Sequence, residues 1–184
     1  MIIVDSEISL LDLEMSSSDA LFRLIDNDRD YLGKWLSWVD TTRSVMDTIN
    51  YIFAMSEHDI YSSRYVMEIW YNNILAGLID VHNGDKINKK AEIGYWLGEQ
   101  FQGKGIMTKS CRAVINYAFN EIGLNRITIK CAEENIKSQA IPKNLNFTFE
   151  GIERDGQFLY NKFVDLYVFS MTKKDWSINI NEKQ

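Results

Sequence analysis

Apolar positions change their spacing several times along the chain, and each change predicts a different element. The run over residues 8–13 is typical of a short strand. Three stretches with helical spacing follow, with apolar positions at Leu21, Leu24 and Ile25, then at Tyr31, Leu32, Trp35 and Leu36, then at Val45, Ile49, Ile52 and Phe53. Ser16–Asp19 before the first stretch, and Thr42 or Ser44 before the third, are residue types that cap helix N-termini.

The middle of the chain predicts strands and then a long helix. Three aromatic, β-branched or otherwise apolar runs indicate strands, at residues 65–71, 74–81 and 91–97. Asn72-Asn73 separates the first two runs, which favours a β-hairpin. From Gly105 to Ile122 the apolar spacing is helical, and Gly123 is expected to end this helix.

The last third predicts strands around one short helix. Strands are expected at residues 126–131, 147–152 and 158–171. The helix is expected from about Ser138 to Leu145, beginning late because Pro142 must lie in its first turns. Asn146 suits a left-handed residue that ends it. The order of elements favours a mixed α/β fold with a mainly antiparallel sheet, rather than a doubly wound parallel sheet.

Length and charge narrow the class of protein. The chain has 184 residues, which predicts one domain over 1–184, with a core at about 7–176 and a flexible tail at 177–184. Its 20 Lys and Arg against 26 Asp and Glu give a net charge of −6, which argues against nucleic acid and anionic membranes as partners. Without a signal-like N-terminus or an apolar run of about 18 residues, we expect a cytoplasmic protein.

Cysteine and histidine offer no metal-binding pattern. Cys111 and Cys131 form no C-x-x-C pair and have no histidine at ligand spacing, so we expect two buried thiols in a reducing compartment. His58 and His82 are isolated and are interpreted as structural or surface residues. No metal is expected.

The segment Gly103-Lys104-Gly105 between a strand and the long helix carries the clearest chemical signal. Paired glycines allow the backbone to approach a ligand closely, and the helix start offers unpaired N–H groups to a phosphate. The spacing matches neither a Walker A loop nor a dinucleotide fingerprint. A purely structural turn is the alternative interpretation.

Residues 100–105, Gln-Phe-Gln-Gly-Lys-Gly, fit the Gln/Arg-x-x-Gly-x-Gly/Ala signature of the GNAT superfamily of acetyl-CoA-dependent N-acetyltransferases. The surrounding Ala-Glu-Ile-Gly-Tyr-Trp-Leu-Gly and Phe-Gln-Gly-Lys-Gly-Ile-Met blocks resemble its ribosomal-protein serine/alanine (Rim-type) branch. The segments at residues 32–40, 131–147, 150–151 and 162–165 are similar to that branch in the same order, so the resemblance covers roughly residues 7–176.

The resemblance implies a GNAT-type sheet, splayed at its centre with helices on both faces, that binds acetyl-CoA. The pyrophosphate would lie on the amides of residues 103–108, and the pantetheine arm would run between the strands at 91–97 and 126–131. A backbone N–H near Trp96 or Leu97 would stabilise the oxyanion. The implied cofactor-binding residues are Trp96, Leu97, Gln102, Gly103, Lys104, Gly105, Ile106, Met107, Thr108, Asn135 and Ser138.

The catalytic residues are less clear. Ser138 matches the branch serine and would face the CoA sulfur; a plain N-cap is the alternative, and the two roles can coexist. Gln157 stands where the branch usually has a glutamate base, and an amide cannot accept a proton near neutral pH. Glu92 is the tentative replacement, with Asp165 as another candidate, and both are also plausible structural acids.

The acceptor is predicted from the same resemblance. Trp35 and Trp38 are expected either to pack in the core or to line the acceptor site. The hypothesis is acetyl transfer to the N-terminal α-amine of a protein such as a ribosomal protein. Acetylation of a small amine (a polyamine, amino-acid derivative or aminoglycoside) and a catalytically silent CoA-binding module are the alternatives. A homodimer is a further expectation.

Overall fold

The computed structural model describes residues 1–56, 59–61 and 64–181, with the side chains of 179–181 left out. His58 therefore lies outside the described residues. The strands are β1 (Ile2–Ile3), β2 (Ile8–Asp12), β3 (Arg64–Tyr71), β4 (Ile74–Asp85), β5 (Lys90–Leu97), β6 (Arg126–Ala132), β7 (Thr148–Leu159) and β8 (Lys162–Thr172). The α-helices are α1 (Ser18–Asn27), α2 (Arg29–Leu32), α3 (Val45–Ala54), α4 (Ile106–Asn120), α5 (Ile136–Asn144) and α6 (Lys173–Asn181), with 3₁₀ turns η1 (Met15–Ser17), η2 (Ser37–Asp40) and η3 (Glu99–Phe101).

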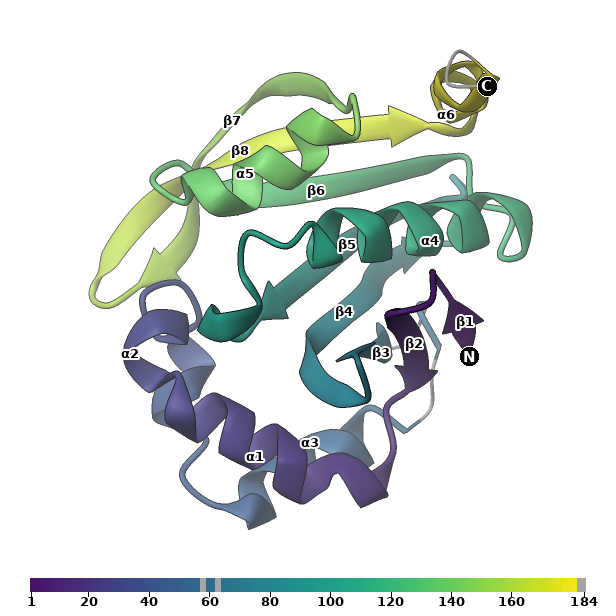
Figure 1. Ribbon diagram of the computed structural model, residues 1–184. Helices are drawn as coiled ribbons and strands as arrows, with labels where there is room; N and C mark the ends of the chain where they lie inside the picture. Colours follow the sequence, from purple (N-terminus) through teal and green to yellow (C-terminus); the bar gives the residue numbers. More distant parts are fainter. Residues whose placement is uncertain (57–58, 62–63, 182–184) are drawn as a thin grey trace.

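All eight strands join one sheet in the order β1-β2-β3-β4-β5-β6-β8-β7. Every neighbouring pair is antiparallel except β5 and β6, which run parallel. Figure 1 shows the sheet crossing the molecule, with β6, β7 and β8 on one side of β5 and the N-terminal strands on the other. The predicted mixed α/β fold with a mainly antiparallel sheet is confirmed.

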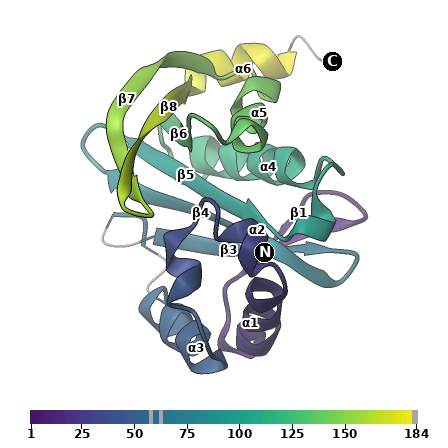
Figure 2. The same cartoon turned by 90° about the vertical axis from the view of Figure 1, so that its left-hand side faces the viewer.

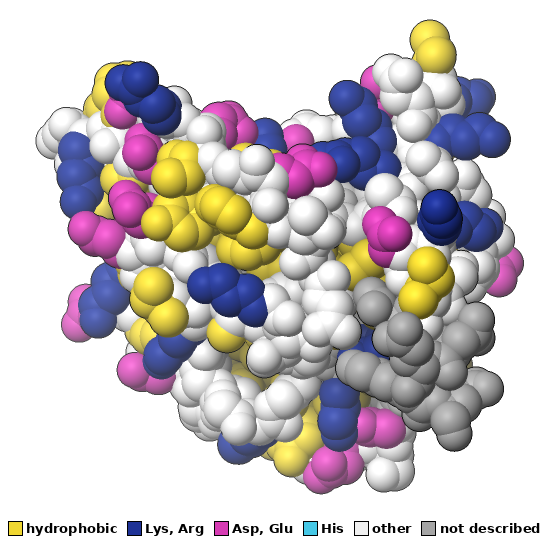
Figure 3. Space-filling model, turned by 90° about the horizontal axis from the view of Figure 1, so that it is seen from above, with side chains coloured by type: hydrophobic (Ala, Val, Ile, Leu, Met, Phe, Trp, Pro, Cys, Tyr) yellow, Lys and Arg dark blue, Asp and Glu magenta, His cyan; other side chains and the backbone are white. Residues whose placement is uncertain are grey.

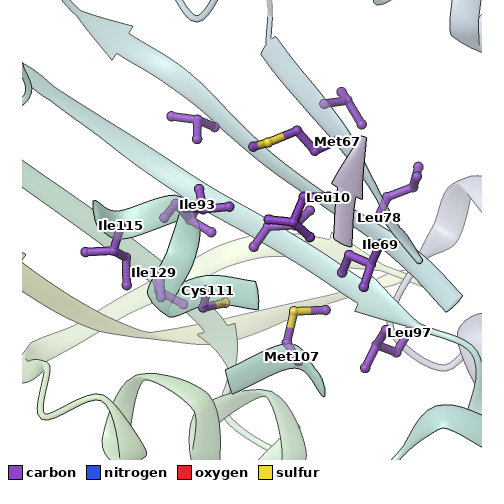
Figure 4. Close-up of a cluster of buried hydrophobic side chains, with 14 of the residues drawn as sticks. Leu10, Met67, Ile69, Leu78, Ile93, Leu97, Met107, Cys111, Ile115 and Ile129 are labelled. Atoms are coloured by element: carbon purple, nitrogen blue, oxygen red, sulfur yellow. The ribbon is translucent and has the colours of Figure 1, made fainter. Parts of the chain in front are cut away.

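Helices cover both faces of the sheet. Figure 2 shows α1, α2 and α3 on one face and α4 and α5 on the other. On the second face, Met107, Cys111 and Ile115 of α4 point toward Ile93 and Ile129 of the central strands (Figure 4). These side chains are buried, so α4 is fixed against β5 and β6 by the removal of apolar surface from water.

Several local predictions are confirmed for physical reasons visible in the backbone. Asn72 and Asn73 both take positive φ, as the tight β3–β4 hairpin requires. Ser44 caps α3 in a capping box with Asp47. Asn146 has φ 59° after α5, the left-handed conformation expected of it.

Element boundaries differ from the prediction at α2 and in the last hairpin. Helix α2 ends at Leu32, before Trp35 and Leu36, and the Arg29 guanidinium donates to the Val39 carbonyl in the 3₁₀ turn that follows. The strand expected at 158–171 is broken by Tyr160 and Asn161. Both take positive φ and form the β7–β8 turn.

The end of α4 and the predicted tail also differ. Helix α4 ends at Asn120 rather than at Ile122, although Gly123 keeps a left-handed φ of 79°. Residues 177–181, expected to be a flexible tail, continue α6, which is anchored by the Trp176 indole donating to Asn116. No helix among the described residues is long and apolar enough to cross a membrane.

Candidate active site

The central feature of the site is the opening between the two parallel strands. Their register pairs only Lys90 with Arg126, Ala91 with Ile127, and Glu92 with Thr128. Both strands continue, β5 to Leu97 and β6 to Ala132, without further pairing between them in the described register. The splay expected of the two strands is confirmed. Facing backbone groups without ladder partners can be satisfied by an extended ligand that enters as a strand.

The loop after β5 ends where α4 begins. Gly103 and Gly105 have φ of 73° and 74°, and a Cβ added at either would meet nothing within 4 Å. Glycine is therefore required by the backbone conformation, and the space beside it is open. Gly105 is the N-cap without a side-chain cap, and the bond from Lys109 N to Gly105 O, 3.1 Å, begins the helical ladder. The backbone amides before Lys109, at the start of α4, have no partner within the helix and lie at the positive end of its dipole.

Ser138 lies in a polar cluster across the opening. Its hydroxyl is 3.2 Å from Cys131 Sγ and 3.5 Å from Tyr95 Oη. Asn135 is the N-cap of α5, and its side chain accepts from Ser138 N at 3.1 Å. The N-cap alternative for Ser138 is therefore wrong, because Asn135 takes that role and leaves the Ser138 hydroxyl directed at the cluster.

Pro142 explains a second contact in this cluster. Helix α5 begins at Ile136, two residues earlier than predicted, so Pro142 lies in its interior. Proline lacks the N–H that would bond the carbonyl four residues earlier, which belongs to Ser138. That carbonyl instead accepts from Tyr95 Oη at 2.9 Å. Burial raises the pKa of the Tyr95 hydroxyl well above its ordinary value, so it stays a donor.

A narrow cavity of about 100 Å³ gathers much of the predicted cofactor site. Six of the eleven predicted residues line it, namely Trp96, Leu97, Gln102, Met107, Asn135 and Ser138. The other five, Gly103, Lys104, Gly105, Ile106 and Thr108, belong to the adjoining loop and first turn of α4. Lys104 lies over the Tyr71 and Phe101 rings, with Nζ 5.5 and 5.8 Å from their centroids.

A larger cavity of about 670 Å³ lies on the face covered by α1 and α3. Leu36, Tyr95 and Trp96 line both cavities, so these residues lie between the two cavities at the end of β5. Trp38 lines the large cavity and packs on Trp96 with ring centroids 5.8 Å apart. Trp35 lines the narrow cavity instead, so the two predicted tryptophans are placed at different parts of the site.

The predicted acids are scattered. Glu92 is partly buried, and one of its oxygens is 3.4 Å from Lys130 Nζ. Gln157 lies on β7 opposite Val164 and is not among the described residues that line either cavity. Asp165 lines a separate cavity and accepts from the Asp155 amide at 2.8 Å.

Sequence reasoning missed three residues of the site. Tyr95 was treated only as part of a strand motif, Asp80 was not singled out, and His82 was interpreted as structural or surface. Asp80 and His82 both line the large cavity, and His82 Nδ1 is 2.5 Å from Asp80 Oδ1. The available signal was their i, i+2 spacing in an apolar strand, which places two polar side chains on one face.

The two cysteines are buried thiols, as predicted. Cys111 and Cys131 are free and buried, and burial raises the pKa of both. Within the part of the chain that the structure describes, no three His, Cys, Asp or Glu side chains gather as a metal site.

Comparison with known proteins agrees with this geometry. A family model described as an acetyltransferase (GNAT) domain matches residues 10–148. YdaF of Bacillus subtilis, named as a candidate ribosomal N-acetyltransferase, is 38% identical over 175 residues, covering 94% of this chain and 95% of that protein. The ribosomal-protein-serine acetyltransferase of Escherichia coli K12 is 29% identical over 152 residues, covering 82% and 84%.

A solved structure supports the same assignment. It is the ribosomal L7/L12 α-N-protein acetyltransferase RimL in complex with coenzyme A, with a TM-score of 0.89 and 27% identity, covering 95% of this chain and 98% of that one. Together with the family match, these relatives confirm the resemblance to the ribosomal-protein branch. The chain belongs to the GNAT family of acetyltransferases and is an N-acetyltransferase.

Proposed function

We propose that this protein transfers an acetyl group from acetyl-CoA to the N-terminal α-amine of a protein, such as a ribosomal protein. The observation that carries the proposal is the continuity of the site. The amides at the start of α4, the opening between β5 and β6, and the Ser138 cluster all adjoin the narrow cavity. That cavity and the large one share Tyr95 and Trp96 as lining residues. We therefore assign the cofactor to the narrow cavity and the acceptor to the large one.

The proposed placement of acetyl-CoA follows from complementary chemistry. The pyrophosphate is assigned to the amides of residues 103–108, where a helix N-terminus favours an anion and no acidic residue lies in the first turn. The pantetheine arm is assigned to the opening beside β5, where its amides replace missing ladder bonds. Gln102, Met107 and Asn135 line this path.

The transfer step assigns roles to this chain's own groups. A backbone N–H at Trp96 or Leu97 stabilises the oxygen of the thioester as it gains negative charge. Ser138 faces the departing sulfur and supplies a proton or a hydrogen bond, since its hydroxyl lies free of the helix cap. Trp38 forms a wall of the acceptor cavity, and Trp35 borders the cofactor side.

The choice of a protein N-terminus is supported by the names of the relatives and by the shape of the cavity. A volume of about 670 Å³ with aromatic walls accommodates more than a small amine. The acidic side chains Asp47 and Asp80 line it and suit a cationic group. Small cationic amines are the second candidate on the same observation. We also propose that residues 1–184 form one domain, because one sheet includes strands from Ile2 to Thr172.

The experiment is a panel assay. The protein is incubated with acetyl-CoA and peptides beginning with Ser or Ala, polyamines or aminoglycosides, and release of free thiol is measured. Turnover with the peptides alone supports the proposal. Turnover with polyamines alone would replace the acceptor, and tight CoA binding without turnover on any amine would favour the silent module suggested by Gln157.

A further inference from the structure

The pair formed by Asp80 and His82 lies at the floor of the large cavity. Both residues come from β4 and point to the same face, and their side chains are only 12% and 19% exposed. Asp80 Oδ1 accepts from His82 Nδ1 at 2.5 Å. This bond assigns the Nδ1 hydrogen and leaves Nε2 as the nitrogen that exchanges a proton.

Charged groups surround this pair on several sides. Arg64 of β3 is opposite His82 in the register, and its NH1 is 3.5 Å from Asp80 Oδ1. Glu92 of β5 is opposite His82 on the other side, and its Oε2 is 3.9 Å from His82 Nε2. Lys130 of β6 pairs with the other Glu92 oxygen and also with Glu153 at 2.9 Å, so Glu92 is already engaged by a cation.

Helix α3 forms part of the wall of the large cavity that contains the pair. Its Tyr51 and Asp47 both line the cavity. Burial, followed by the Asp80 carboxylate, raises the pKa of Tyr51 to about 12, so this hydroxyl remains protonated near neutral pH. Within the described lining of this cavity, His82 is the one imidazole, and its Nε2 has a lone pair that can accept a proton.

Gly94 connects the pair to the place where β5 and β6 separate. It is opposite Asp80 in the register and follows the last paired position, Glu92, by two residues. A Cβ at position 94 would lie 3.1 Å from Asp80 Oδ2 and 3.2 Å from His82 Cε1. Because glycine has no side chain, no Cβ of residue 94 covers the pair where β5 borders the opening in which the thioester is proposed to lie.

We propose that His82, oriented by Asp80, accepts a proton from the attacking amine. It would take the role of the glutamate that the branch usually has at the position of Gln157. This inference rests on the proposed acetyl transfer, but not on which amine is the natural acceptor. His82 is the catalytic residue because it receives the proton. Asp80 is a positioning residue that orients the imidazole. Glu92 and Arg64 are the charged side chains next to the pair.

The proton balance follows the established reaction of the family. The acceptor ammonium gives one proton to His82 Nε2, directly or through one water, and becomes a neutral amine. The amine nitrogen forms a bond to the acetyl carbon, and the carbon–sulfur bond breaks. The second amine proton reaches the CoA sulfur through the Ser138 side of the site, which yields the thiol. His82 then releases its proton to water.

The test compares His82→Gln, Asp80→Asn and Glu92→Gln in the full-length protein, using whichever amine of the panel gives the highest turnover. We expect His82→Gln to lower kcat/KM about 100-fold or more and to abolish the rise of kcat/KM with pH. Asp80→Asn should lower it less, and Gly94→Ala should lower it by crowding the pair. Asp85→Asn is the matched control, an exposed carboxylate on β4 whose bonds go to Asn88, and should leave the rate unchanged.

Two further measurements separate chemistry from misfolding. Acetyl-CoA affinity by calorimetry should be unchanged in His82→Gln, and added imidazole should restore part of the rate of His82→Ala. An unchanged rate and pH profile in His82→Gln would overturn the inference, as would loss of the pH-dependent rise in Glu92→Gln alone. If the wild type acetylates any amine of the panel, the role of His82 can be tested whether or not that amine is the natural acceptor. A wild type that turns over no amine refutes this inference together with the proposed transfer.

Discussion

The contact between Tyr95 and the carbonyl freed by Pro142 predicts a measurable coupling. Removing the hydroxyl with Tyr95→Phe leaves the Ser138 carbonyl without the N–H of residue 142 and without Tyr95 Oη. Loss of one partner of a buried hydrogen bond costs about 1–3 kcal/mol. We therefore expect the free energy of unfolding of Tyr95→Phe to fall by about that amount.

Pro142→Ala provides the second half of a double-mutant cycle. Alanine restores an N–H four residues after Ser138, which can donate to the same carbonyl, so Tyr95→Phe should be less costly in this background. The cycle cancels the separate effect of proline on the unfolded chain. The expected coupling energy is about 1 kcal/mol, the net value of one hydrogen bond.

Urea unfolding of the four proteins measures this coupling, with equal m-values as the check that one transition is compared. Tyr71→Phe is a matched control, because its exposed hydroxyl donates to Glu7 at 3.2 Å and should contribute at most about 0.5 kcal/mol. Strict additivity of Tyr95→Phe and Pro142→Ala would mean that the two residues are not coupled through the Ser138 carbonyl.

Three other predictions concern the cofactor site and acid stability. Gly105→Ala and Gly123→Ala both place a side chain at positive φ in open space, so each should cost about 1–2 kcal/mol of stability, but only Gly105→Ala should weaken acetyl-CoA binding by calorimetry. Ser138→Ala should lower kcat with little change in acetyl-CoA affinity; an unaltered kcat at every pH would remove its proposed role. Hydrogen bonds from Arg126 and Ser170 lower the pKa of Glu150 to about 2. The ionised carboxylate therefore adds to the free energy of unfolding above the ordinary glutamate pKa, and this contribution should be lost as the pH falls toward 2. Glu150→Gln should show a smaller loss in acid unfolding, and equal losses would contradict this.

The elements were largely predictable because their signals are local. The paired asparagines at 72–73, the alternation along β6 and the apolar stripe of α4 each depend on residues close in sequence. The start of α5 was not predictable in the same way. Pro142 argues for a later start, and only Tyr95, 47 residues away, supplies the donor that lets the proline lie inside the helix.

The residues of the site also differ in how far local sequence predicts them. The glycine loop was predictable because Gly103 and Gly105 answer to a local backbone requirement. For His82 the i, i+2 spacing to Asp80 was the local signal, but its other two neighbours, Glu92 and Arg64, come from β5 and β3 and could not be read from the sequence around it. Gln157 shows the converse. Its match to a family position gave no information about whether it reaches either cavity.

The proposed function depends on main-chain amides at the start of α4 that hold the diphosphate of acetyl-CoA while its pantetheine arm lies between β5 and β6. A crystal structure of the complex would show this placement. We expect phosphate oxygens within hydrogen-bond distance of the amides of residues 103–108, with the sulfur facing Ser138. Acetyl-CoA bound on another surface, with the β5–β6 opening empty, would contradict it.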